Sequence, residues 1–306
     1  MKRRDHRVQD TCHSVCRLRM GLALLILLLV RPVAADESSP PTGGKGGKQQ
    51  AADPHKERRL EFMNSSVQEY EILVGPDFES KLVVVPEPLL RFTNPVSGLQ
   101  DGGFVVWKSE SGRPMVGAQV FLTSEDLWLH EFQSLAPVPL RVVRNGENAW
   151  EPSRAGAEVQ LFPDAPAPAT TAVQRLTQMR QLARRFSVSD EFEGREQSDE
   201  LRLLSNPLMR FGDPQTETLD GGLFTYAHGT DPELLIILEA KKTDEGFRWH
   251  YALAPMTGYA LKAALDAKPV WEVPWRKPPF DPNDPFFIII HSREPSLKGL
   301  LDIFGK

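Results

Sequence analysis

Histidine is the residue type in this sequence best suited to acid–base chemistry, and one histidine lies in a strand-like segment. Residues 127–132 read LWLHEF. Alternation along a strand would place Trp128, His130 and Phe132 on one face and Glu131 on the other. His130 and Glu131 therefore cannot easily pair with each other, and His130 would need a carboxylate from elsewhere to act as a general base.

Glu239 and Asp101 are the acidic residues that we consider as partners for His130 in a hydrolase or lyase. Thiol chemistry is excluded from the rest of the chain, because Cys12 and Cys16 both lie in the first 35 residues. A histidine beside aromatic residues is more often a core residue with satisfied hydrogen bonds. His130 is accordingly a catalytic candidate whose simpler interpretation is structural.

Two arginines and a tryptophan are the candidate ligand-binding residues. Arg91 and Arg210 occupy matching positions, in Leu-Arg-Phe and Met-Arg-Phe. A guanidinium can bind an anion through two parallel hydrogen bonds, or it can tie a strand to an acidic neighbour. Trp128 could line a carbohydrate or peptide surface, although aromatic residues at alternating strand positions usually pack in the core. For all three residues the structural alternative is the simpler one.

The sequence predicts no metal ion and no cofactor. No His-x-His or His-Glu-x-x-His spacing occurs. Asp-Gly-Gly occurs at 101–103 and again at 220–222, but a phosphate-binding loop would precede a helix. Both glycine pairs precede strand-like residues instead, so we expect them to supply positive φ for a tight turn into a sheet.

The charge balance argues against nucleic acid as a partner. Outside the first 35 residues the chain has 29 Lys and Arg against 39 Asp and Glu. A net negative surface does not neutralise phosphates.

The N-terminus has the features of an export signal. Six Lys and Arg residues precede an apolar run of 11 residues from Met20 to Val30, whereas a membrane-spanning helix needs roughly 20. Small residues follow, so we expect a signal peptide over 1–35 with cleavage near Ala35. The alternative is an uncleaved anchor. Residues 36–56 are rich in Gly, Pro and Ser and are expected to be a flexible linker.

An internal similarity organises the remainder of the chain. Aligning Lys81 to Trp107 with Glu200 to Tyr226 without gaps gives nine identities in 27 positions. Two copies of one module are therefore predicted, over 57–155 and 171–276, with a Pro/Ala-rich connector at 156–170 and a C-terminal strand and helix over 277–306.

Each copy starts with apolar residues at three- and four-residue steps and continues with short β-branched and aromatic runs. The first pattern is typical of an amphipathic helix and the second of antiparallel strands. The predicted class is α+β, an internally duplicated module in which each copy is a helix plus an antiparallel β-meander. A cleft between the copies is then the expected ligand site.

The export signal, the Leu-Arg-Phe-x-x-Pro and Asp-Gly-Gly segments, His130-Glu131-Phe132 and the run from Arg175 to Ala183 resemble a group of exported bacterial proteins with no assigned activity. The resemblance covers most of 57–276. It implies export and transfers no functional residue.

Together these observations predict a soluble, exported, non-enzymatic binding or interaction protein, periplasmic or secreted, with no membrane span after cleavage. The alternative is an exported hydrolase or lyase that uses His130. A third hypothesis, an anchored envelope component, would place the chain beside an envelope protein partner.

Overall fold

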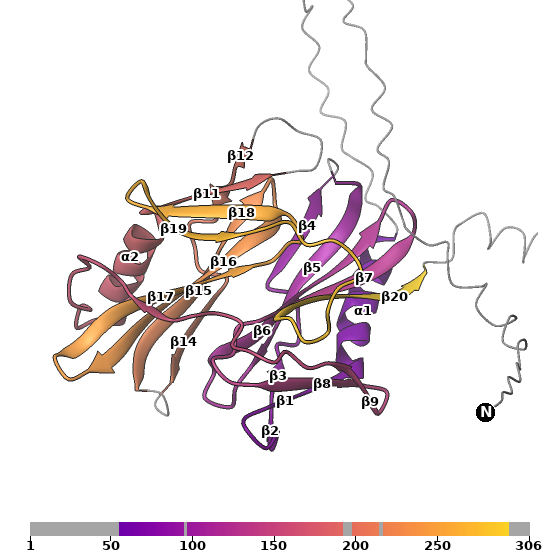
Figure 1. Cartoon of the computed structure of the whole chain (residues 1–306), viewed down its shortest axis with the longest axis horizontal. Helices are drawn as coiled ribbons and strands as arrows, with labels where there is room; N and C mark the ends of the chain where they lie inside the picture. Colours follow the sequence, from indigo (N-terminus) through magenta and orange to yellow (C-terminus); the bar gives the residue numbers. More distant parts are fainter. Residues whose placement is uncertain (1–54, 95–96, 192–197, 214–216, 294–306) are drawn as a thin grey trace, which may run out of the picture. The chain divides into compact units, whose positions relative to one another are not determined.

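The computed structural model describes residues 55–94, 97–191, 198–213 and 217–293 (Figure 1). The predicted signal peptide, nearly all of the linker and the final helix lie outside these residues. Of the described residues, 54% lie in strands and 11% in helices. The fold is therefore rich in antiparallel β-sheet, and the predicted α+β class is wrong. The prediction that each copy is one helix plus one meander is also wrong, because the strands of each half form two separate sheets.

Two α-helices, one before each set of strands, account for most of the helical residues. They are α1 (Lys56–Ser66), followed by the 3-10 turn η1 (Val67–Glu69), and α2 (Ala172–Ala183). The N-terminus of α2 is capped by Thr171, whose hydroxyl accepts a hydrogen bond from the amide of Gln174. Their buried methionines, Met63 and Met179, face the sheets.

The first half contains a small sheet and a large one. The small sheet has the order β2-β1-β8-β9 and the large sheet the order β20-β7-β6-β5-β3, with β4 also paired to β5. The strands are β1 (Tyr70–Val74), β2 (Ser80–Lys81), β3 (Val83–Val84), β4 (Leu90–Asn94), β5 (Leu99–Lys108), β6 (Pro114–Thr123), β7 (Leu127–Ser134), β8 (Leu140–Arg144), β9 (Glu147–Trp150) and β20 (Phe286–Arg293).

The second half has corresponding strand orders, β12-β11-β18-β19 and β10-β17-β16-β15-β13, with β14 paired to β15. The strands are β10 (Gln160–Leu161), β11 (Phe186–Glu191), β12 (Asp199–Glu200), β13 (Arg202–Leu203), β14 (Met209–Asp213), β15 (Thr218–His228), β16 (Asp231–Thr243), β17 (Gly246–Pro255), β18 (Ala260–Leu265) and β19 (Lys268–Val273).

The last strand returns to the first half. β20 pairs with the edge strand β7, with Phe286 opposite Gln133, and Figure 1 shows it beside β7. In the second half the same edge position, next to β17, is taken by β10 from the connector. The tail and the connector are thus both part of the sheets.

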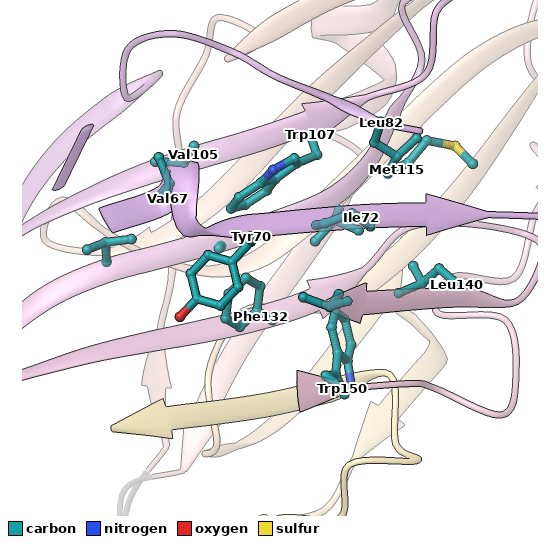
Figure 2. Packing of buried hydrophobic residues seen from close by; sticks show 14 of the residues in the cluster. Val67, Tyr70, Ile72, Leu82, Val105, Trp107, Met115, Phe132, Leu140 and Trp150 are labelled. Carbon is teal, nitrogen blue, oxygen red and sulfur yellow. The ribbon is translucent and has the colours of Figure 1, made fainter. Parts of the chain in front are cut away.

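Three apolar clusters hold these sheets together. One lies between the two sheets of the first half, and Figure 2 shows its side chains Tyr70, Trp107 and Phe132 close together. The second is its counterpart in the second half. The third joins the two large sheets, with Phe104 from β5 and Leu235 from β16 among its members. We call this contact between the large sheets the seam.

The glycine pairs have a different role from the one expected. They lie inside β5 and β15 and do not have positive φ. A Cβ atom on Gly102 would lie 2.7 Å from the ring of Phe92, and one on Gly221 would lie 2.6 Å from the ring of Phe211. The glycines therefore permit close packing of an aromatic ring on a strand, so the predicted turn is wrong.

Candidate functional site

His130 is fully buried on β7 and has hydroxyl partners. Its Nδ1 lies 2.8 Å from the hydroxyl of Tyr70, and its Nε2 lies 3.3 Å from the hydroxyl of Ser66. The ring also stacks on His291 at 4.4 Å. Burial, with His291 as a second cause, lowers the pKa of His130 well below its usual value. His130 is therefore a neutral core residue with no solvent access.

Neither acidic partner that was considered for His130 approaches it. Glu239 accepts a hydrogen bond from Arg113 at 2.9 Å, and both residues are buried. Asp101 accepts hydrogen bonds from Arg91. The histidine pair is in contact with Glu69, whose carboxylate lies 3.0 Å from Nε2 of His291.

The two matching arginines tie each helix to its sheet. Arg91 binds both oxygens of Asp101, at 2.8 and 2.5 Å, and also the carbonyl of Lys56 in α1. Arg210 binds Asp220 at 2.6 Å and the carbonyl of Ala172 in α2. Trp128 is fully buried, with its ring 4.4 Å from that of Phe62. The structure thus places Arg91, Arg210 and Trp128 in structural contacts.

A cavity of about 200 Å³ lies where the two halves meet the connector. Gln133 at the end of β7 contributes one wall. The end of the first copy and the start of the connector form another, through Arg154, Ala155, Gly156, Glu158 and Gln160. The second half contributes residues of β17 and β19, and Arg276 and the start of β20 complete the lining. Leu253, Trp271 and Phe286 make part of this lining apolar.

Two polar atoms in the cavity wall lack hydrogen-bond partners among the described residues. They are Nη1 of Arg276 and Oε1 of Gln133, and both atoms are buried. The guanidinium of Arg276 lies over the ring of Phe286, with Cζ 4.7 Å from the centroid, and burial lowers its pKa. Gln133 and Arg276 therefore each bring to the cavity lining a polar group with one atom that has no hydrogen-bond partner.

The connector wall is held tightly against the first half. The amide of Gly156 donates to the carbonyl of Ala136 at 3.1 Å, and Nε2 of Gln133 donates to the carbonyl of Gly156 at 3.2 Å. A Cβ on Gly156 would lie 1.9 Å from the carbonyl oxygen of Ser134. Only glycine fits here, so the position of this wall is fixed by backbone contact.

Sequence reasoning did not single out Gln133, Arg154, Trp271 and Arg276 together. They come from β7, the segment just before the connector, β19 and the segment before β20, and no short motif links them. The one sequence-based indication of this region was the expectation that a ligand would bind between the two copies.

Comparison with protein-family models, curated proteins and solved structures found no match to this chain. Among the described residues, no helix has the length and apolar character needed to span a membrane.

Proposed function

We propose that the protein is an exported, non-enzymatic binding protein whose ligand site is the cavity between the halves, and that the ligand is a small organic acid with a hydroxyl or amine. The observation that carries this proposal is the pair of buried atoms without partners, Arg276 Nη1 and Gln133 Oε1. Export rests on the N-terminal sequence pattern.

The chemistry of the ligand follows from these two atoms. Leaving a buried donor or acceptor without a partner costs about 1–3 kcal/mol, and more for a charged group. A carboxylate would accept from Arg276 and regain that energy, and a hydroxyl or amine would donate to Gln133. Trp271 and Leu253 would contact the carbon skeleton of the ligand.

The cavity volume indicates the size of ligand that it can hold. At roughly 30 Å³ per water molecule, 200 Å³ holds about six or seven waters. A ligand of similar atom count, such as a hydroxy acid of three carbons, fits this space.

The enzymatic alternative has less support. A general base must reach the proton that it abstracts. His130 is 0% exposed, and both of its ring nitrogens already have hydroxyl partners.

Calorimetry with L-lactate and glycerate tests the binding site. We expect saturable binding in the millimolar range, the strength typical of about six atoms, and no binding of propane-1,2-diol, which lacks the carboxylate. Arg276→Gln should weaken binding at least tenfold. Arg248→Gln is the matched control, because Arg248 is exposed and paired with Glu245, and it should leave binding unchanged. Absence of binding for both acids, or equal loss in both variants, would overturn the proposal.

The mass of the mature N-terminus tests export separately. We expect the mature chain to begin at Asp36, and retention of residues 1–35 would contradict cleavage.

A further inference from the structure

Three residues that the sequence analysis did not group lie together in the second half. Asp190 is the second-last residue of β11 and lies opposite Asp199 of β12. His228 is the last residue of β15. One nitrogen or oxygen atom from each residue lies within 4.8 Å of the others. This cluster is outside the cavity described above.

Asp190 gives the independent reason to expect a ligand here. Its side chain is 0% exposed, and neither carboxylate oxygen makes a hydrogen bond within the described residues. A carboxylate in such a place is strongly disfavoured unless a cation compensates it. The nearest cationic candidate is His228, whose Nδ1 is 3.5 Å from Oδ2 of Asp190.

That separation fits two ligands of one metal ion better than a hydrogen bond. The pair His291 and Glu69, in contrast, has the ordinary hydrogen-bond distance of 3.0 Å. Zinc binds nitrogen and carboxylate oxygen at about 2.0–2.2 Å, so two ligands at tetrahedral angles are roughly 3.4 Å apart.

The donor set indicates the kind of ion. An imidazole nitrogen with two carboxylates suits a transition metal, whereas Mg²⁺ and Ca²⁺ prefer oxygen ligands alone. Three protein ligands also leave a fourth position for water. The side chain of His228 is 21% exposed, which leaves a route from solvent.

The first half does not have these ligands. In the first half, Val74 of β1 lies opposite Ser80 of β2, and these positions correspond to Asp190 and Asp199. Ser109, which follows β5, corresponds to His228. A packing requirement common to both halves would not need carboxylates and imidazole in one half alone. The presence of these three residues in the second half alone is consistent with a ligand site that only the second half has.

We propose that Asp190, Asp199 and His228 bind one divalent transition-metal ion, and that Zn²⁺ is the ion their donor set fits best. The proposal is independent of the organic-acid site.

Zinc titration of the full chain without an affinity tag tests the proposal. Cys12→Ser and Cys16→Ser are introduced first, because thiolates also bind zinc. After treatment with EDTA, ZnCl₂ should bind with a stoichiometry of one. It should raise the melting temperature by about 5 °C or more at a hundredfold excess over Kd. MgCl₂ should produce no shift.

Two variants locate the ion. Asp190→Asn, which preserves shape, and His228→Gln should each abolish the zinc-dependent shift while circular dichroism shows a folded chain. His250→Gln is the matched control, because His250 lies on β17 with Nδ1 near the carbonyl of Arg248, and it should retain the shift. The spectrum of bound Co²⁺ should change in the first two variants only. No stoichiometric binding, or binding that survives both ligand variants, would overturn the proposal.

Discussion

At the scale of single residues, the side chains that suggested chemistry are the ones that the fold uses for packing. His130, Arg91 and Arg210 all have internal partners. Alternation along β7 separates His130 from Glu131, since the ring of His130 packs near that of Phe132 in the first-half core, whereas the charges that act on buried Glu131 are those of Asp231 and Arg276. The partners of His130 could not be predicted, because Ser66 and Tyr70 are more than 50 residues away in sequence.

Replacement of His130 should reveal a buried hydrogen bond. His130→Leu leaves the Tyr70 hydroxyl without its partner, so we expect a loss of about 2–3 kcal/mol in the free energy of unfolding. Tyr70→Phe should lose about 1–2 kcal/mol, and the double variant should lose less than the sum of the two. Urea denaturation measures all three, and strict additivity would contradict a direct Tyr70–His130 bond.

The pH dependence of the same variant has a definite sign. The pKa of His130 is lowered in the folded state, so the unfolded chain takes up a proton below about pH 6.5 that the folded chain does not. His130 therefore destabilises the fold progressively as the pH falls below that value. His130→Leu should remove this part of the acid sensitivity, while lactate binding at neutral pH should remain.

At the scale of elements, local patterns predicted strands well and sheets poorly. The runs at 104–107, 116–122 and 127–135 lie in or overlap β5, β6 and β7. The pairing of β1 with β8, and of β20 with β7, joins distant segments whose register depends on tertiary packing. Apolar residues in the sequence keep the three- and four-residue spacing of a helix as far as Tyr70, where the structure has already begun β1. The predicted α+β class is wrong because it gave the two helices the same importance as the strands, whereas the described residues form two α-helices and twenty strands.

The contribution of β20 can be measured at one position. Phe286 is buried opposite Gln133, whereas Ile290 on the same strand is 62% exposed. Phe286→Ala should cost about 3–5 kcal/mol, the usual range for a buried phenylalanine. Ile290→Ala should change stability by about 0.5 kcal/mol or less. Thermal unfolding of both variants gives the comparison, and similar losses would show that β20 does not anchor the tail.

At the scale of the whole described unit, the seam combines apolar packing with buried charge. Arg113 of the first half pairs with Glu239 of the second, and Asn94 donates to Asp231 at 3.0 Å. Glu131, Asp231 and Glu233 are also buried at this contact, and burial raises the pKa of each. A cavity lies in the region between the halves where the sequence led us to expect a ligand site, but its lining residues could not be named because they meet only when both halves and the connector are folded.

Asp231 should make this contact sensitive to pH. Burial raises its pKa to about 7 from a usual 3.8, with Asn94 and Gln119 opposing the shift through hydrogen bonds, while Glu131 and Glu233 are neighbouring acids. The folded chain thus holds a proton that the unfolded chain releases, and stability falls as the pH rises through this interval.

Asp231→Asn should therefore stabilise the fold, and its advantage over the unchanged chain should grow by roughly 2–3 kcal/mol between pH 5 and pH 8. Asp266→Asn is the control, because Arg185 lowers the pKa of Asp266 from a usual 3.8, so this variant should lose a similar amount of stability at pH 5 and at pH 8. Urea denaturation at the two pH values decides between them, and a constant advantage for Asp231→Asn would show that ionisation of this carboxyl does not control the seam.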